Sequence, residues 1–414
     1  MELVLITSHF PYEGESFIEN EIKYISDYFS KIYIICGEKN SLRKEINTPL
    51  NWEVIMVNDT KTSFITYFKS ILNLFTLSTI KEIKFAYVNY DSIRLIDILK
   101  RIFAYNLNSN KTLYKIIKNI DTKDNMKIYY SYWLSSEAYT LVKLKRKIKN
   151  SYCISRAHGY DAFFNRGYQS YRKLLSEKLD EIHFVSSVGL NQFNNVIPNK
   201  RNNIYLSKLG TINDSTVHYK ELNQTFHILS CSNVIELKRL DLIIEAISYI
   251  SDFNIIWTHI GSGILLEQIK ELASSVLKSR NIEYNFLGQL TNREVKKYYE
   301  EKNIDLFLNL SDYEGVPVSM MEALSYGIPI LARNVGGNSE IVIDNYNGFL
   351  LQSDVTAENI AKIIKLYYFS NEERKQKFYE NSKNFWMKNY NAEINYTGFV
   401  RSVIARYKAS KLND

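Results

Sequence analysis

The stretch NIIWTHIGSGILLEQIKELASSVL, residues 254–277, decides the fold because it contains one complete strand, turn and helix. Its first part, 254–263, is an apolar run that ends in Gly-x-Gly and predicts a buried strand followed by a turn. Its second part, 264–277, predicts a helix. Strands that alternate with helices build parallel sheets with helices on both faces. The stretch therefore predicts an α/β fold.

The same alternation continues on both sides of this stretch. Residues 226–232 and 304–310 predict strands, and residues 241–250 and 317–326 predict helices. The first half of the chain predicts strands at 3–8, 32–36, 152–156 and 181–186, helices at 15–29 and 64–80, and more basic helices up to Lys149. We therefore expect two Rossmann-like, doubly wound domains.

The length of the chain predicts where these domains lie. The 414 residues exceed the roughly 250–300 residues at which a single core stops growing. The strand pattern restarts after Gln224, which predicts a join near 206–225. We expect one domain over 1–208 and a second over 209–384, with a helix from about 385 to 414 that packs back on the first.

Composition limits the compartment and the partners. The three cysteines are far apart, and no apolar run reaches about 18 residues, so we expect a cytoplasmic protein without a transmembrane helix. Residues 61–150 hold 17 Lys and Arg against 6 Asp and Glu, a net charge of +11. This basic half suits an anionic lipid or a phosphorylated substrate. It contains no recognised nucleic-acid-binding module, so nucleic acid is not an expected partner.

The stretch DYEGVPVSMMEALSYGIPI, residues 312–330, places two glutamates around the start of a predicted helix. A helix N-terminus attracts phosphate, which Glu314 would repel, so a carboxylate there suits sugar hydroxyls instead. Glu322 lies further into the helix among apolar residues and needs partners such as two ribose hydroxyls. The alternative is a capped helix with one ion-paired glutamate and no ligand.

The residues around these glutamates resemble a known family. EGVPVSMMEALSYGIPILARNVGGNSEIV is similar to the donor-site signature of family 4 glycosyltransferases, the glycosyl transferases group 1 set with the GT-B fold. SCSNVIELKRLDLIIEAI, WTHIGSGILLEQI and NFLGQLTNREVKKYYEEKNIDLFLNLSDYEG extend the resemblance over about 226–350. SHFPYEGESFIENEI and SRAHGYDAF match more loosely. The resemblance is to bacterial capsule, O-antigen and exopolysaccharide members, and it implies two domains that face each other across a cleft.

The resemblance implies a role for each matching residue. Lys238 would neutralise the donor diphosphate, Glu314 would hold hydroxyls of the transferred sugar, and Glu322 would hold the ribose. With His158, the residues Lys238 and Glu314 are the expected catalytic groups. The complete expected donor-binding set is Gly14, Asn233, Lys238, Arg239, Gly261, Gly263, Leu287, Glu314, Gly315, Val316, Pro317, Val318 and Glu322.

One position departs from the family pattern. Many members have an arginine five residues before the lysine, as a second phosphate clamp, and this chain has Asn233 there. Arg239 is the candidate substitute. Gly336 and Gly337 indicate either a second close approach to the donor or a simple strand–helix turn.

The first domain supplies the expected acceptor side. His158 ends a predicted strand where the family has an active-site histidine, and Asp161 lies three residues later. Gly14 would lie beneath the diphosphate. Glu15 and Ser16 would face the cleft and contact the acceptor, although Ser16 is also suited to capping the helix.

The expected activity is therefore a retaining, metal-independent transfer of a hexose-type sugar from a UDP- or GDP-linked donor. The acceptor would be an oligosaccharide or a polyprenyl-diphosphate-linked glycan in surface polysaccharide synthesis. No Asp-x-Asp motif occurs in the chain, which argues against a metal on the diphosphate, and no cofactor is expected.

Membrane contact is the expectation for the basic half. The helix at 64–80 would place an aromatic face in an anionic leaflet, and the lysines of LVKLKRKIK, 141–149, would bind its headgroups. The enzyme would then be peripheral on the inner face of the plasma membrane. The alternative is that the apolar residues belong to the core and the lysines are only solvated.

Two other functions stay open, namely a nucleotide-sugar epimerase of similar fold and a non-catalytic partner subunit of a glycosyltransferase. The basic first half argues against the epimerase, and Asn233 is the only feature that supports the partner subunit. The stretch HIGSG, 259–263, lacks the third glycine of the dinucleotide fingerprint, which argues against a nicotinamide dehydrogenase.

Overall fold

The computed structural model describes most of the chain in two compact units. The described residues are 1–12, 15–37, 49–57, 63–121, 126–148, 150–198, 201–215 and 225–412. The N-terminal unit comprises Met1–Lys208 and Tyr396–Asp414, and the C-terminal unit comprises Leu209–Asn395. The chain thus returns to the first unit at Tyr396, later than the 385 expected from sequence. The facing arrangement of two domains across a cleft stays a prediction.

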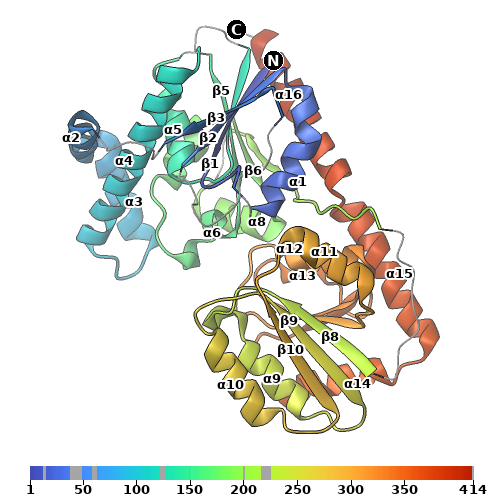
Figure 1. Cartoon of the computed structure of the whole chain (residues 1–414). Coiled ribbons are helices and arrows are strands. Elements are labelled where there is room, and N and C mark those ends of the chain that lie inside the picture. Colours follow the sequence, from blue (N-terminus) through green and yellow to red (C-terminus); the bar gives the residue numbers. More distant parts are fainter. Residues whose placement is uncertain are drawn as a thin grey trace. The chain divides into compact units, whose positions relative to one another are not determined.

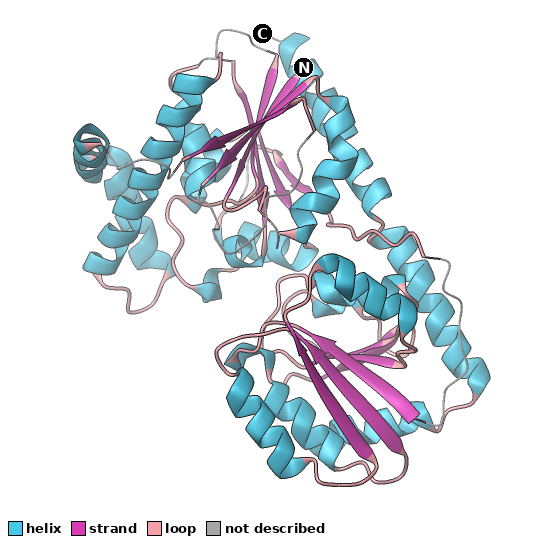
Figure 2. Cartoon of the chain, viewed as in Figure 1, coloured by secondary structure: helices cyan, strands magenta, loops and turns pink. Residues whose placement is uncertain are grey.

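In the described part of the N-terminal unit, seven parallel strands form one sheet with the order β3-β2-β1-β4-β5-β6-β7 (Figures 1 and 2). The inner strands are buried on both faces, as their continuous apolar runs require. The strands are β1 Glu2–Thr7, β2 Lys31–Cys36, β3 Trp52–Met56, β4 Lys127–Ser131, β5 Tyr152–Ala157, β6 Glu181–Phe184 and β7 Ile204–Leu206.

Helices and short 3-10 turns surround this sheet (Figure 1). They are α1 Ser16–Ile25, η1 Ser26–Tyr28, α2 Phe64–Leu72, η2 Asn73–Phe75, α3 Leu77–Asn89, α4 Leu95–Asn119, α5 Ser136–Lys145, α6 Gly159–Ala162, η3 Phe164–Arg166, α7 Arg172–Lys178 and α8 Ser187–Val196. The final helix, α16 Ala392–Leu412, begins in the C-terminal unit and belongs to the N-terminal unit from Tyr396 onward.

The expectation of basic helices up to Lys149 was wrong at one central element. Residues 127–131 form β4, which pairs with both β1 and β5. This strand is only five residues long and starts with a lysine, so its apolar pattern is too short to distinguish it from the helices around it. Lys127 is buried and forms an ion pair with Glu2 of the adjacent strand, with 3.0 Å between Nζ and Oε2.

The lysine run 141–149 does not form one basic surface. Lys143 is buried, and its Nζ donates to Ser109 Oγ at 2.7 Å and to Asn110 Oδ1 at 2.7 Å. Lys145 forms an ion pair with Asp180. Arg146 and Lys147 are exposed, and Lys149 lies outside the described residues. The predicted headgroup contact therefore loses Lys143, because helix α5 turns that side chain toward α4.

The predicted single helix at 64–80 is two helices. Helix α2 ends at Leu72, the turn η2 follows, and α3 starts at Leu77. Thr76 caps α3, since its hydroxyl accepts a hydrogen bond from the Thr79 N–H. The break separates the two helices of this segment, which both pack on α4.

A buried polar network joins α1, β4 and β5. Arg156 and Glu21 are almost fully buried and form an ion pair, with 3.0 Å between Nη2 and Oε2. Tyr130 and Tyr132 donate hydrogen bonds to the two oxygens of Glu21. A buried carboxylate requires such partners, and this one has a cation and two hydroxyls. The network supports the strand that leads to His158.

The C-terminal unit contains a second parallel sheet, which has six strands in its described residues, in the order β10-β9-β8-β11-β12-β13. The strands are β8 Thr225–Cys231, β9 Asn254–Ile260, β10 Ile282–Gly288, β11 Leu306–Asn309, β12 Ile330–Arg333 and β13 Gly348–Leu351. The helical elements are η4 Glu236–Lys238, α9 Leu240–Ser248, α10 Leu266–Val276, α11 Asn292–Glu301, α12 Val318–Ser325, α13 Asn338–Ile341, α14 Ala357–Tyr368 and α15 Glu372–Asn389. Buried residues of β8, β9, α9 and α14 share one apolar core, which includes Trp257.

No helix in the described part of the chain combines the length and the apolar character that crossing a bilayer requires.

Candidate active site

The candidate site lies at the carboxyl edge of the C-terminal sheet. Strands β8, β9, β11 and β12 are parallel, so the loops that follow them emerge at the same edge. The loop after β8 leads to Lys238, the loop after β11 carries Glu314, and the turn after β12 contains Gly336 and Gly337. The alternation of strands and helices thus positions the residues that the sequence singled out.

Lys238 and Glu314 form an ion pair, with 2.6 Å between Nζ and Oε1. Two neutral groups also donate to this same oxygen, the Asn309 side-chain amide at 3.1 Å and the Ser311 hydroxyl at 2.7 Å. Among the described residues, no donor bonds the other oxygen, Oε2. The carboxylate is therefore held in place by one oxygen, and the second is available to accept hydrogen bonds.

Glu314 lies just before the N-terminus of α12. Pro317 occupies the N-cap position, and its carbonyl accepts from the Met320 and Met321 N–H groups. The first N–H groups of any helix have no partner within the helix and carry partial positive charge. Gly315, Val316 and Val318 thus lie beside a helix end that suits an anion, as predicted for the donor phosphates.

The glycines of the site pack against neighbouring loops. Gly336 has φ +52°, and a Cβ there would lie 1.8 Å from the Glu314 carbonyl oxygen, while a Cβ on Gly337 would lie 1.9 Å from that of Gly315. Gly261, with φ +143°, approaches the Ser232 carbonyl oxygen in the same way. These positions require glycine because two backbones meet there. The close approach predicted for Gly336 and Gly337 is thus to the Glu314 loop.

Gly263, two residues later in the same loop, makes an equivalent contact. A Cβ there would lie 2.3 Å from the Val234 carbonyl oxygen, and the Val234 N–H donates to the Ser262 carbonyl at 2.9 Å. Gly261 and Gly263 therefore support the 232–234 backbone, and their predicted contact with the donor stays a prediction.

Glu322 is buried inside α12. Its Oε1 accepts a hydrogen bond from the Asn292 side-chain amide at 2.9 Å, from the first turn of α11. Burial raises the pKa of Glu322, and the Asn292 bond opposes that rise. Burial is the main cause that raises the pKa of the Cys231 thiol, at the end of β8, to about 12. The nearby charge of Glu322 adds to that rise. The carboxyl group thus has one neutral partner among the described residues.

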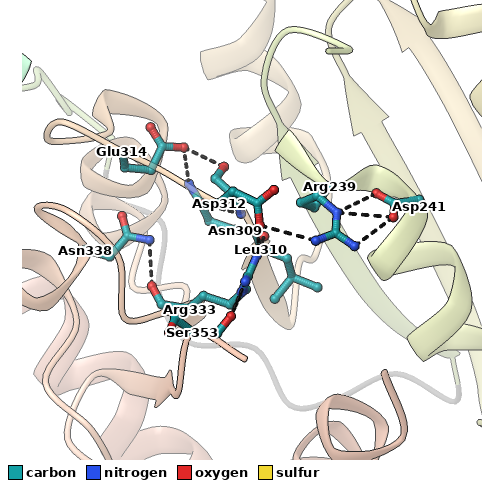
Figure 3. A network of polar contacts seen from close by, with 10 residues as sticks. Arg239, Asp241, Asn309, Leu310, Asp312, Glu314, Arg333, Asn338 and Ser353 are labelled. Carbon is teal, nitrogen blue, oxygen red and sulfur yellow. Dashed lines mark hydrogen bonds and ion pairs between the residues drawn. The ribbon is translucent and has the colours of Figure 1, made fainter. Parts of the chain in front are cut away.

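Figure 3 shows a network that joins three loops of the site around Asp312. Arg239, after η4, donates to Asp312 Oδ1 at 3.2 Å, and Arg333, at the end of β12, also pairs with that carboxylate. Arg333 further donates to the Leu310 carbonyl at 3.1 Å and to the Ser353 carbonyl. Asp312 therefore connects the loop that carries Lys238 to the loop that carries Glu314.

The remaining predicted donor residues differ in exposure. Asn233 is exposed near the start of the loop that follows β8. Arg239 is engaged by Asp241 as well as Asp312, so two carboxylates already neutralise the guanidinium that was the candidate substitute for an arginine at 233. Leu287 lies on β10 and is 40% exposed. Its predicted contact with the nucleotide stays a prediction.

His158 belongs to the N-terminal unit, directly after β5. Its ring packs on Trp133, with 4.5 Å between centroids, and on Tyr132 and Phe17. Burial, together with the nearby charge of Arg156, lowers the pKa of His158 to about 3. The imidazole is therefore neutral at pH 7. Its Nε2 is buried and has no hydrogen-bond partner among the described residues.

The predicted acceptor residues are mostly turned inward. Asp161 is buried, and its Oδ2 accepts from the N–H groups of His158 and Leu134, each at 3.2 Å. Burial raises the pKa of Asp161 to about 6. Glu15 is also buried, and its Oε2 accepts from the N–H of Phe10 at 2.7 Å. Both carboxylates hold backbone, and their contact with an acceptor stays a prediction.

Gly14, a predicted donor-binding residue, lies outside the described residues. Ser16 is the first residue of α1 and Glu15 takes the N-cap position, so Ser16 is not the capping residue.

Sequence reasoning missed several residues that hold the site together. Asn309 and Ser311 position Glu314, Asp312 and Arg333 connect the loops, and Asn292 bonds Glu322. The stretch NLSDYE, 309–314, shows the polar cluster beside Glu314, but its residue types alone are also typical of a turn. Within the described residues, no group of three or more His, Cys, Asp or Glu side chains is arranged to hold a metal ion.

Comparisons with known proteins find similar glycosyltransferases. Residues 217–385 match the model of the family described as glycosyl transferases group 1. The uncharacterized glycosyltransferase MJ1178 of Methanocaldococcus jannaschii is 28% identical over 318 residues, which cover 74% of this chain and 86% of that protein. The O-antigen biosynthesis glycosyltransferase WbnH of Escherichia coli is 25% identical over 297 residues, which cover 67% and 78%.

Solved structures agree on the fold. Anabaena HepE, crystallised with UDP and glucose, superposes with a TM-score of 0.65 over 98% of this chain and 100% of that one, at 11% identity. The fold is thus GT-B, with two Rossmann-like domains. Residues 217–385 are thus a glycosyl transferases group 1 domain, as the sequence motifs predicted, and the similar proteins named glycosyltransferases support a transferase activity.

Proposed function

We propose that this glycosyltransferase moves a hexose-type sugar from a nucleoside-diphosphate donor to a glycan acceptor in bacterial surface polysaccharide synthesis. The observation that carries the proposal is the Lys238–Glu314 pair beside the N-terminus of α12. It combines a cation, a helix end and a carboxylate with one available oxygen. The names of two similar proteins support it, since HepE was crystallised with UDP and glucose and WbnH is named for O-antigen biosynthesis.

In this proposal Lys238 exchanges partners when the donor binds. The ammonium turns from Glu314 toward the diphosphate, where it stabilises the charge that develops on the leaving nucleoside diphosphate. Glu314 stays in place because Asn309 and Ser311 continue to donate to Oε1. Its Oε2 then accepts hydrogen bonds from hydroxyl groups of the transferred sugar, and Glu322 holds the ribose.

The reaction we propose is retaining and needs no metal ion. The acceptor hydroxyl attacks the anomeric carbon on the face that the leaving phosphate vacates, and a phosphate oxygen takes the hydroxyl proton. Lys238 and the α12 N–H groups provide the positive field that a metal supplies in other glycosyltransferases. His158 is neutral at pH 7, so it acts without a charge, through the buried Nε2 that has no partner among the described residues.

The proposed acceptor is an oligosaccharide or a glycan on polyprenyl diphosphate, and the N-terminal unit binds it. Such an acceptor is anionic at its diphosphate and is held in the lipid leaflet. The net charge of +11 over 61–150 is complementary to it. We place the enzyme on the cytoplasmic side of that membrane.

One observation favours a second candidate, the non-catalytic partner subunit. Asn233 leaves the usual second phosphate clamp without a charge, and Arg239 is neutralised by Asp241 and Asp312. A partner subunit would keep the fold and bind no donor. Donor binding therefore separates the two candidates.

The test measures thermal unfolding of the whole chain with a panel of UDP- and GDP-sugars and with UDP and GDP alone. A ligand at 100 times its dissociation constant stabilises the native state by about 2.7 kcal/mol. We expect one nucleotide class to stabilise the wild type. Lys238→Ala should lose most of that shift. Glu314→Gln should keep the shift from the nucleoside diphosphate and lose the additional shift from its sugar.

Lys270→Ala is the matched control, because Lys270 forms an exposed ion pair with Glu267 on α10 of the same unit. It should behave as the wild type. If no nucleotide stabilises the wild type, the transferase proposal fails and the partner subunit replaces it. Conversion of the donor to its epimer without any acceptor would instead indicate the epimerase.

A further inference from the structure

Helices α2 and α3 bury polar side chains and expose apolar ones, which is the reverse of a helix on the surface of a soluble protein. The described buried residue of α2 is Ser70, whose hydroxyl accepts from the Asn110 side chain of α4 at 3.0 Å. Its large apolar residues are exposed, including Phe64 at 81% and Phe68 at 50%. A surface helix of a soluble protein buries its apolar stripe and exposes its polar one. Helix α2 does the opposite.

Helix α3 shows the same reversal. Its buried side includes Thr79, whose hydroxyl lies 3.2 Å from the Tyr171 hydroxyl, and Glu82, which accepts from the Tyr168 hydroxyl at 2.9 Å. Its exposed side includes Leu77 and Ile80, and Phe75 of the intervening turn is 79% exposed. Figure 1 shows both helices on the outer side of α4. We call these residues the apolar face: Phe64, Ile65, Phe68, Leu72, Phe75, Leu77 and Ile80.

On the two helices that carry the apolar face, the exposed charges have one sign. Lys69, Lys81 and Lys84 are exposed on these two helices. The acidic residue between them, Glu82, is buried. In the described structure no carboxylate lies within ion-pair distance of the three lysines. Helices α2 and α3 therefore present exposed aromatic and aliphatic side chains and unpaired ammonium groups without an exposed acidic group of their own, and Asp91 is an exposed carboxylate just after α3.

We propose that the apolar face docks this enzyme on an anionic lipid leaflet. Interfacial helices place aromatic and aliphatic side chains at the boundary of the acyl chains, while lysines beside them bind lipid headgroups. A protein partner would have to match seven apolar residues and three cations without an acidic residue in return. A bilayer satisfies both requirements at once. The proposal adds the docking surface to the proposed function, but its test needs neither donor nor acceptor.

The test is co-sedimentation of the full chain with two kinds of vesicle. One contains phosphatidylcholine alone, and the other contains phosphatidylcholine with about 30% of the anionic lipid phosphatidylglycerol. We expect the wild type to bind the anionic vesicles and to release as salt rises. The variant Phe64→Ser/Phe68→Ser/Phe75→Ser should bind at least about a hundredfold more weakly, because three aromatic rings leave the leaflet.

Two further variants separate the apolar and the ionic contributions. Lys69→Gln/Lys81→Gln/Lys84→Gln should lose about a hundredfold on the anionic vesicles and little on phosphatidylcholine. Ile264→Ser/Leu366→Ser/Phe369→Ser removes three comparably exposed apolar residues from the C-terminal unit and should bind as the wild type. All variants replace exposed side chains, and circular dichroism checks that they fold.

Three outcomes would overturn the proposal. The first is a wild type that binds neither vesicle. The second is equal loss of binding in the aromatic variant and in the C-terminal control. The third is a concentration-dependent dimer that the aromatic variant abolishes while vesicle binding stays unchanged, because a second copy would then cover the apolar face. A failure of nucleotide binding would leave this result unaffected.

Discussion

At the scale of single residues, the buried cations of the N-terminal unit behave differently from one another. Arg156 has a carboxylate partner in Glu21. Lys143 has only neutral partners, which are the side chains of Asn106, Ser109 and Asn110. Burial, with the nearby charge of Arg146, lowers the pKa of Lys143 from 10.5 to about 7. An ammonium without a counter-ion is the form that burial disfavours.

Lys143 should make the stability of the chain depend on pH. Its pKa is lower in the folded state, so between pH 7 and pH 9 the unfolded chain binds more protons, and stability rises with pH in that window. We expect the free energy of unfolding to rise by about 2 kcal/mol more in the wild type than in Lys143→Met. Urea denaturation at both pH values measures this difference. Parallel curves for the two proteins would show that Lys143 stays charged when folded.

At the scale of elements, the site depends on loops that several strands place together. The β8 loop supplies Lys238, the β11 loop supplies Glu314, and Asp312 links them through Arg239 and Arg333. The same arginine at the end of β12 also bonds the Leu310 and Ser353 carbonyls. The orientation of Glu314 thus depends on contacts from three strands that are distant in sequence.

Asp312→Asn should loosen this arrangement without removing a group from the donor site. The asparagine keeps the shape but not the charge that holds both arginines. We expect the affinity for the nucleotide identified in the donor panel to fall about tenfold, since small misplacements of a positioned group are costly. Isothermal titration measures the dissociation constant.

Asp241→Asn is the matched control, because Asp241 contacts Arg239 and no other described arginine. Its effect should be clearly smaller than that of Asp312→Asn. Equal effects would indicate that the charge of Arg239 matters and that the link between the two loops does not.

At the scale of the whole molecule, the last helix brings the end of the chain back to the N-terminal unit. Arg406 of α16 forms a bidentate pair with Glu181 of β6, at 2.7 and 2.8 Å. Glu181 is 1% exposed. Burial opposes its ionisation, but bonds from His183 and Arg406 lower the pKa of Glu181 to about 2. The carboxylate is therefore charged at neutral pH and depends on this contact.

Arg406→Gln should destabilise the N-terminal unit by about 2 kcal/mol, because it removes one cation from a buried carboxylate. Arg401→Gln on the same helix removes only an exposed contact with the Tyr28 hydroxyl and should change stability by less than about 0.5 kcal/mol. Chemical denaturation measures both. Equal stabilities of the two variants would mean that α16 contributes no specific contact at Arg406.

The sequence by itself determined the fold class and pointed to the candidate donor residues. Strand and helix alternation depends on local periodicity, and the stretch 312–330 carries Glu314 and Glu322 on a recognisable turn and helix. The family resemblance then pointed to Lys238. These features are local or motif-based, so no tertiary information was needed for them.

Only the tertiary structure decided how these residues are held. Asn292, Asn309, Asp312 and Arg333 have no distinctive local pattern, because their partners come from other strands. Strand β4 could not be predicted from the sequence for the same reason, since its five residues acquire their strand geometry from pairing with β1 and β5. The burial of Lys143 and the outward turn of Phe64 follow from packing on α4, which local sequence does not encode.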